Sequence, residues 1–191
     1  MTKPLLQIVV ASTRPGRVGL PVAQWFQKVA DKHAGFAVEL VDLAAVDLPL
    51  MNEPNHPRLR QYVHEHTRRW SAQVDRADAF VFVMPEYNHG YTAPLKNAID
   101  YLSQEWANKP VGLVSYGGVS AGTRAVTTLD PVLNAVKLRP AGANVHIPLV
   151  TQFLTEERTI APNDVMSAAA QALMVELEVL AHTLKPLRKK S

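Results

Sequence analysis

Short, uninterrupted apolar runs alternate with longer amphipathic stretches along this chain of 191 residues. The clearest run, from Ala79 to Met84, contains no polar residue. Strands that are covered on both faces have this pattern, because parallel sheets are buried between helices. The alternation therefore predicts a doubly wound α/β domain, with helices on both faces of a parallel sheet.

Five strands and five helices are expected. The predicted strands are residues 5–11, 37–41, 79–84, 111–115 and 144–147. The predicted helices lie near residues 19–33, 57–76, 93–106, 123–136 and 163–184. Ligands of such sheets bind beyond the carboxyl ends of the strands, so the loops after the first, third and fourth strands form the candidate site.

Composition excludes several classes of protein. With no cysteine, the chain has no disulfide, no Cys-ligated metal and no thiol nucleophile. Lys and Arg exceed Asp and Glu by only 20 to 17, and part of this excess lies in a short basic tail, so nucleic-acid binding is not expected. No apolar run approaches the roughly 20 residues of a membrane helix, and we expect a cytoplasmic protein without membrane contact.

The first loop, Ala11 to Gly19, suits a phosphate group. It contains two hydroxyl groups and two guanidinium groups at the start of a predicted helix, where free N–H groups and the helix dipole favour an anion. It has neither the Gly-Lys-Ser/Thr ending of a P-loop nor a GxGxxG fingerprint. An ordinary polar turn that caps the helix is an equally good interpretation of this loop alone.

The second loop begins with Pro85, Glu86 and Tyr87, directly after the most apolar strand. A rigid backbone beside an aromatic ring can hydrogen-bond the edge of a flat heterocycle and cover its face. Asn88 and His89 would lie at the rim of such a site.

The third loop contains Gly118-Val119-Ser120-Ala121-Gly122, which matches the GxSxG elbow of serine hydrolases. An elbow requires the strand to run directly into the first glycine, whereas the predicted strand ends near residue 115. Asp164 and His182 follow in the order of a catalytic triad, but both lie on one predicted helix, about five turns apart. A hydrolase that uses Ser120 is therefore the weaker interpretation, and glycines that let backbone approach a ligand are the better one.

The segment Pro85-Glu86-Tyr87-Asn88, followed by Pro94-Leu95-Lys96-Asn97-Ala98-Ile99-Asp100 and preceded by Ser12-Thr13-Arg14, resembles the NADPH-dependent FMN reductase family of flavodoxin-like proteins. The likeness covers nearly the whole chain. It implies a single FMN-binding domain over residues 1–191, a three-layer sandwich whose five-stranded parallel sheet has the order 2-1-3-4-5.

The resemblance also implies which residues bind the cofactor. The FMN phosphate falls on Ser12, Arg14, Arg17, Val18 and Gly19. The isoalloxazine ring falls along Pro85, Glu86, Tyr87, Asn88 and His89, and its other side on Ser115, Tyr116, Gly117 and Gly118. The chain departs from the commonest family pattern at Ala11, where many members have glycine, and at Gly90, Thr92 and Ala93, which replace a more usual Ser, Pro and Gly.

The implied reaction passes a hydride from NADPH or NADH to N5 of the flavin and then to an acceptor. Quinones, azo dyes, metal oxyanions and free flavin are candidate acceptors, and no catalytic side chain is required. A flavodoxin-type electron carrier, inert toward NADPH, is the main alternative. The resemblance also implies a homodimer or homotetramer, with Leu95 to Trp106 at the dimer interface beside the site.

Two further features have simple interpretations. His64 and His66 are two residues apart on a predicted helix and would point to different faces, so we expect solvated histidines and no metal site. The stretch from Pro49 to Pro57 is expected to be a connector rather than a substrate lid.

Overall fold

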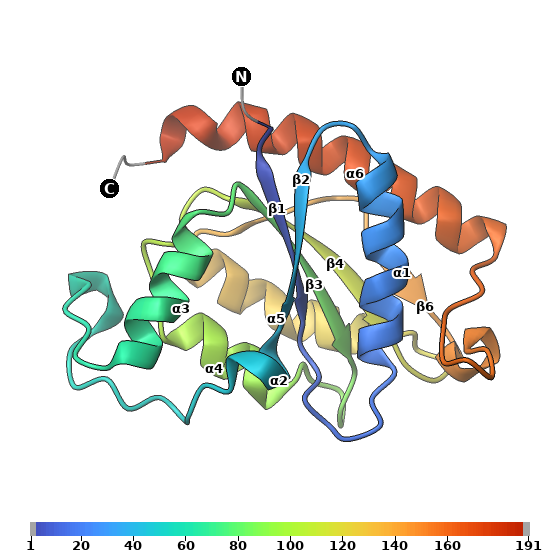
Figure 1. Cartoon of the computed structure of the whole chain (residues 1–191), viewed down its shortest axis with the longest axis horizontal. Coiled ribbons are helices and arrows are strands. Elements are labelled where there is room, and N and C mark those ends of the chain that lie inside the picture. Colours follow the sequence, from blue (N-terminus) through green and yellow to red (C-terminus); the bar gives the residue numbers. More distant parts are fainter. Residues whose placement is uncertain (1–2, 189–191) are drawn as a thin grey trace.

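The computed structural model describes residues 3–188, so Lys189 and Lys190 of the basic tail lie outside the described residues. A parallel sheet forms the centre of the molecule, in the strand order β2-β1-β3-β4-β5, and β6 also pairs with β4 (Figure 1). Its strands are β1 (Leu5–Val10), β2 (Ala37–Asp42), β3 (Ala79–Pro85), β4 (Pro110–Tyr116), β5 (Arg139–Pro140) and β6 (Val145–Ile147). The doubly wound fold and its strand order are confirmed.

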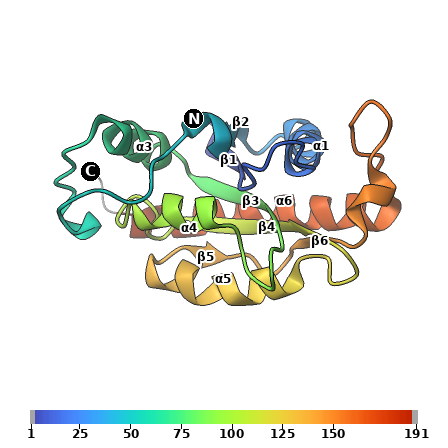
Figure 2. The ribbon, with the colours of Figure 1, turned by 90° about the horizontal axis from the view of Figure 1, so that it is seen from below.

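Helices cover both faces of the sheet. On one face lie α1 (Gly19–Lys32) and α6 (Asp164–Leu184), and on the other lie α3 (Glu65–Asp75), α4 (Ala93–Asp100) and α5 (Thr123–Ala135). Successive residues of β3 serve the two cores, since Val81 packs on the α1 side whereas Phe80 and Phe82 pack on the α3 side. Figure 2 shows α1 and α5 on opposite sides of the strands. This double burial explains why β3 has no polar residue.

Two short strands fill the fifth position of the sheet. β5 pairs with the start of β4, and β6, which is the strand predicted at residues 144–147, pairs with its end. Between them the side chain of Asn144 accepts the N–H of Leu113 at 3.0 Å, in place of a backbone carbonyl. The sheet therefore keeps its hydrogen bonds across the interruption.

The helix predicted near residues 57–76 is confirmed only in its second part, and its beginning is wrong. A 3-10 turn, η1 (Pro57–Leu59), ends at Arg60, whose φ of 52° stops a helix, and α3 begins only at Glu65. Glu53 accepts the free N–H groups of Val63 and His64 before α3. The helix predicted near residues 93–106 is also shorter than predicted, because α4 ends at Asp100.

His64 and His66 do not point to different faces. His64 precedes α3 in an extended conformation, so the two imidazole rings stack with centroids 5.1 Å apart. Both Nε2 atoms contact Asn52, at 3.1 and 3.0 Å. The histidines therefore tie the Pro49 to Pro57 stretch to α3.

The same stretch is fixed to α4. The Asn97 side chain donates to the carbonyl of Pro49 at 2.7 Å and accepts the N–H of Met51 at 2.9 Å. The Tyr101 hydroxyl donates to Asn52 at 2.9 Å. These bonds fix the stretch against α4, and its role as a connector rather than a substrate lid stays a prediction.

Three short elements complete the fold: α2 (Leu43–Val46), η2 (Val150–Phe153) and η3 (Lys185–Leu187). The segment Asp164–Leu187, made of α6 and η3, is long and apolar enough to cross a membrane by length and composition. This differs from the expectation that no run approaches such a length. One face of α6, which includes Leu173, Met174 and Leu177, is buried against the sheet in this structure.

Candidate cofactor site

The loop between β1 and α1 leaves the start of α1 open to an anion. Val18 is the N-cap residue but makes no capping hydrogen bond through its side chain, and the first turn has no acidic residue. The exposed side chain of Arg14 has no ion pair among residues 3–188. Unsatisfied N–H groups, the positive helix end and a free guanidinium together suit a phosphate.

Arg17, the second guanidinium of this loop, is already paired. It forms an ion pair with Asp42, and both side chains are largely buried. Its Nε atom is buried and has no hydrogen-bond partner within the described part of the chain. A buried unpaired donor is costly, so an acceptor from a bound group would stabilise it.

Arg158 also supports the first loop, and no sequence pattern indicated it. Its guanidinium donates to the carbonyls of Gly16 and Arg17 at 3.0 and 3.3 Å. The contact spans more than 140 residues of sequence. A single exposed arginine in a polar turn gives no signal of such a long-range role.

Two tyrosines connect the first loop with the other two loops. The Ser12 and Tyr87 hydroxyls lie 3.0 Å apart, which links the first and second loops. Tyr116, at the end of β4, lies so close to α1 that a Cβ on Gly19 would come within 2.5 Å of its hydroxyl. Burial, with repulsion from Tyr87, raises the pKa of Tyr116, although the Ser12 hydroxyl and nearby arginines oppose this effect. Tyr116 is therefore a neutral hydrogen-bonding group at physiological pH.

The second loop is a tight turn. Tyr87 and Gly90 exchange two backbone hydrogen bonds of 2.9 Å, and Asn88 and His89 between them have φ values of 49° and 66°. Positive φ at both central residues is the mark of a type I′ turn. Asn88 and His89 are exposed at its tip, and Tyr87 is 40% exposed.

Glu86 joins the second loop to the third. Its carboxylate accepts the Ser120 hydroxyl at 3.3 Å and the backbone N–H of Arg124 at 3.2 Å, and it pairs with the Arg124 guanidinium. Burial alone would raise the pKa of Glu86, but the charge and hydrogen bonds of Arg124, with that of Ser120, lower it. The carboxylate therefore stays ionised and links the second and third loops.

The third loop is shaped by Ser115 and Gly122. The buried Ser115 hydroxyl donates to the carbonyl of Ala121 at 2.8 Å, and Nδ1 of His146 lies 2.7 Å from the same hydroxyl. Gly122 has φ of 80°, and a Cβ there would lie 2.9 Å from that of Ser115. Gly117 and Gly118 follow β4 directly and are anchored to Val150 and Leu149 by their carbonyls.

The geometry does not form a serine hydrolase site. β4 ends at Tyr116, well before Ser120, so there is no strand-to-serine elbow. The Ser120 hydroxyl contacts Glu86 and Arg124 rather than a histidine. Asp164 and His182 lie at opposite ends of α6. Within the described residues there is also no group of three or more His, Asp or Glu that could hold a metal ion.

A cavity of about 350 Å³ lies beside the first loop, between α2 and the start of α4. Thr13, Leu48 and Pro94 are among its lining residues. It is mostly apolar and borders the same edge of the sheet, so it can receive part of a flat ligand.

The predicted site residues therefore come together at one edge of the sheet. The contacts between Ser12 and Tyr87, between Gly19 and Tyr116, and between Glu86 and Ser120 connect all three loops. In Figure 1 the loops after β1 and β3 lie along the lower edge of the sheet, beyond the carboxyl ends of the strands. This fold and this polar edge define the flavodoxin-like class of α/β proteins.

Comparison with known proteins gives the family. The model of the NADPH-dependent FMN reductase family matches residues 4–152. The chain belongs to this family, and it is an enzyme that uses FMN and NAD(P)H. The uncapped start of α1 and the buried Nε of Arg17 fit the phosphate of FMN.

Curated relatives agree. An NAD(P)H-dependent FMN reductase of Schizosaccharomyces pombe is 39% identical over 140 residues, which cover 72% of this chain and 70% of that protein. An NADPH azoreductase of a Bacillus species is 33% identical over 135 residues, 69% of this chain and 70% of the relative. An NAD(P)H:quinone oxidoreductase of Solanum tuberosum is 35% identical over 98 residues, 50% of this chain and 48% of the relative.

A solved structure confirms the fold. The flavoenzyme NAD(P)H:acceptor oxidoreductase FerB of Paracoccus denitrificans aligns with a TM-score of 0.69 and 21% identity. The alignment covers 96% of this chain and 98% of FerB.

Proposed function

We propose that this enzyme oxidises NAD(P)H through FMN held at the carboxyl edge of the sheet and passes the electrons to a small-molecule acceptor. When bound, FMN supplies a ring that accepts a hydride from NAD(P)H and returns two electrons to the acceptor. Quinone and azo compounds are the acceptor classes that the relatives' names support. The meeting of three loops at the uncapped start of α1 carries this proposal.

Each loop has a distinct task in the proposed site. N–H groups at the start of α1, with Ser12, Arg14 and Arg17, bind the phosphate. Val18 and Gly19 complete that seat. The backbone of Pro85 to His89 holds one side of the ring, and the segment from Ser115 to Gly118 holds the other. No side chain has to move a proton for hydride transfer, so the chain's role is to bind, orient and leave one ring face open.

The exposed surfaces of Tyr87 and Val119 border the proposed open face. Val119 is 86% exposed beside the third loop, and Tyr87 is 40% exposed beside the second. Apolar and aromatic groups at the mouth of the site suit flat acceptors that stack on the ring, with few specific contacts.

A direct assay tests this proposal. Protein reconstituted with FMN is mixed anaerobically with NADPH. The flavin absorbance at about 450 nm is followed before and after a quinone is added. We expect bleaching by NADPH and recovery with the quinone. Flavin that binds but is not bleached would identify an electron carrier, and protein that does not retain FMN would contradict the proposal.

We also propose that the enzyme is a cytoplasmic homodimer or homotetramer. Leu50 lies on the connector, which is hydrogen-bonded to α4 next to the site, and Leu59 and Val63 lie between the connector and α3; all three are exposed large apolar residues. This surface covers much of the Leu95 to Trp106 segment, so the connector itself is placed to contact a second copy. Light scattering during gel filtration measures the mass, and a monomer at micromolar concentration would contradict this part of the proposal.

A further inference from the structure

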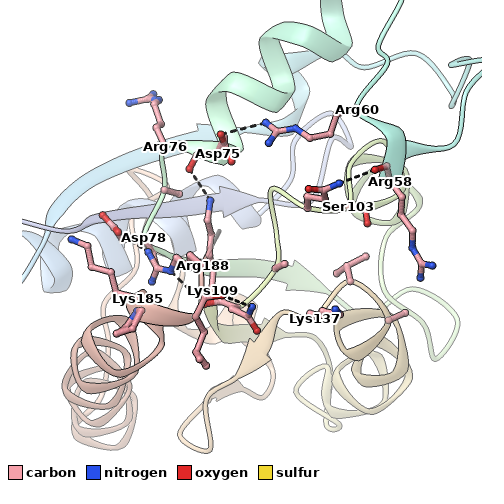
Figure 3. A pocket seen from close by; sticks show the side chains of 18 residues that line it. Arg58, Arg60, Asp75, Arg76, Asp78, Ser103, Lys109, Lys137, Lys185 and Arg188 are labelled. Atoms are coloured by element: carbon pink, nitrogen blue, oxygen red, sulfur yellow. Dashed lines mark hydrogen bonds and ion pairs between the residues drawn. The ribbon is translucent and has the colours of Figure 1, made fainter. Parts of the chain in front are cut away.

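A large cavity lies at the opposite edge of the sheet from the proposed FMN site. Its volume is about 830 Å³, and it is lined by the segments that lead into β3 and β4, together with η1, the end of α5 and η3 (Figure 3). Asp78 and Lys109 precede these two strands directly, whereas the FMN loops follow them. The cavity is therefore a separate feature of the molecule.

Positive charge is concentrated around this cavity. Its lining has two carboxylates, Asp75 and Asp78, and seven basic residues: Arg58, Arg60, Arg76, Lys109, Lys137, Lys185 and Arg188. This excess of five is larger than the net charge of +3 for the whole chain. The rest of the molecule therefore carries a net negative charge, and the basic residues are not spread evenly.

Four of these basic residues have partners within the protein. The buried Nζ of Lys109 donates to the carbonyls of Val74 and Asp75 at 2.8 Å. Arg188 pairs with Asp78 at 2.6 Å. Arg60 lies 3.4 Å from Asp75, and Arg76 pairs with Glu39 on β2. Folding alone accounts for their positions, since they satisfy chain carbonyls and carboxylates.

Arg58, Lys137 and Lys185 are different. They make no ion pair with any of residues 3–188, and they come from three segments that are far apart in the sequence. In Figure 3, Lys185 and Lys137 lie on either side of Lys109 and Arg188. All three side chains are exposed, so water screens their mutual repulsion, but together they make the cavity attractive to an anion.

The remaining wall is not charged. Ala107, Val136 and Leu187 offer apolar surface beside the basic residues, and Leu187 is 60% exposed. A cavity of this size with apolar and cationic walls suits a small organic molecule that carries several negative charges. Inorganic phosphate alone would leave most of the volume and the apolar wall unused.

We propose that this cavity binds a nucleotide with two or more phosphate groups, at a site separate from the FMN site. Its phosphates would contact Lys137, Lys185 and Arg58, and its base would lie against the apolar wall. Such a ligand neutralises the unpaired cations without breaking the ion pairs of Arg60 and Arg188. This proposal does not depend on which acceptor the enzyme reduces.

Isothermal titration of the FMN-loaded enzyme tests the proposal, with ADP and pyrophosphate as the probes. We expect ADP to bind without displacing FMN, and more tightly than pyrophosphate because of the apolar wall. Affinity should fall as salt is raised, since the contacts are charge-assisted. Equal affinity for the two probes, loss of FMN absorbance on titration, or no heat of binding would each overturn it.

A matched pair of variants locates the site. The double variant Lys137→Glu, Lys185→Glu should lower ADP affinity by about tenfold or more, because two attractive charges become repulsive. The control, Lys28→Glu with Lys32→Glu, makes the same charge change on exposed residues of α1, away from the cavity. Equal loss of affinity in both double variants would show a general charge effect and would overturn the proposed location.

Discussion

Gly19 and Tyr116 set how closely the first loop approaches the end of β4. Gly19 is buried at the start of α1, where the Tyr116 hydroxyl occupies the space that a Cβ would need. The same hydroxyl lies near Ser12, a member of the proposed phosphate seat. Packing between these residues therefore fixes the seat relative to the sheet.

Gly19→Ala should weaken both folding and FMN binding. The added methyl group would lie 2.5 Å from the Tyr116 hydroxyl, so the ring or α1 must shift. Overpacking of this kind costs about 1–3 kcal/mol. Urea unfolding measures the loss of stability, and fluorescence titration measures FMN affinity.

A second substitution tests the cause. Tyr116→Phe removes the clashing oxygen and leaves the next ring atom 3.4 Å from the added methyl group. The double variant should therefore recover part of the stability lost in Gly19→Ala. Strictly additive losses would show that the hydroxyl is not the source of the strain.

Arg14→Ala tests the phosphate seat with little risk to the fold, because this side chain is exposed and has no ion pair among the described residues. Loss of one charge-assisted bond to phosphate costs about 1.5–3 kcal/mol, or roughly ten- to a hundredfold in FMN affinity. Arg69→Ala, an exposed arginine on α3, is the control. Unchanged FMN affinity in Arg14→Ala would place the phosphate elsewhere.

Among the elements, the second and third loops act as one unit because Glu86 connects them. Its carboxylate is 6% exposed and satisfies both the start of α5 and Ser120. The link holds the turn at Asn88 and His89 against the glycines after β4.

Glu86→Gln should weaken the link between the two loops and remove the part of the acid dependence of stability that Glu86 contributes. Because the partners of Glu86 lower its pKa in the folded state, its ionised form stabilises the fold above the ordinary carboxyl pKa, and this contribution is lost as pH falls below it. At pH 7 the free energy of unfolding of the variant should be lower by about 1–3 kcal/mol. The free energies of unfolding of the two proteins should differ near neutral pH and become similar at about pH 3.5.

Glu65→Gln is the matched control for Glu86→Gln. Glu65 pairs with Arg68 on the surface of α3, with both side chains at least half exposed. Exposed pairs contribute little, so this variant should lose under about 1 kcal/mol. A Glu86→Gln variant that behaves like the control would show that the loops do not depend on the link.

Elements could be predicted from the sequence where the residue pattern reflects burial. They could not be predicted where contacts between distant segments determine the local structure. The apolar run from Ala79 to Met84 indicated a central strand because both of its faces are covered. The break at Arg60 was missed, since left-handed backbone at an arginine has no sequence signal. The stacking of His64 on His66 depended on that break.

The candidate site shows the same division. The three loops could be predicted, because parallel strands end at one edge and polar residues follow them. The ion pair of Arg17 with Asp42 and the support from Arg158 could not, because both depend on how distant segments pack. The roles assigned to individual site residues stay predictions.

Over the whole molecule, the two edges of the sheet have different charges and different tasks. The carboxyl edge brings three loops together at the proposed FMN site, and the amino edge collects seven basic residues around a cavity. Lys109 lies at the amino edge, 5% exposed, between α3 and β4.

Lys109 should make stability depend on pH in the alkaline range. Burial lowers its pKa to about 8, so between that pH and its ordinary value of 10.5 the unfolded chain holds a proton that the folded chain has released. The contribution of Lys109 to the free energy of unfolding therefore rises with pH, by about 2 kcal/mol between roughly pH 8 and pH 10. Lys109→Met should lack this rise in urea unfolding, and parallel curves for the two proteins would contradict the low pKa.

A crystal structure of the enzyme with FMN tests the central claim most directly. We expect the phosphate within hydrogen-bonding distance of the start of α1 and of Arg14, with the ring between the backbone of residues 85–89 and that of residues 115–118. FMN bound away from these three loops, for example in the basic cavity at the amino edge, would contradict the proposed site.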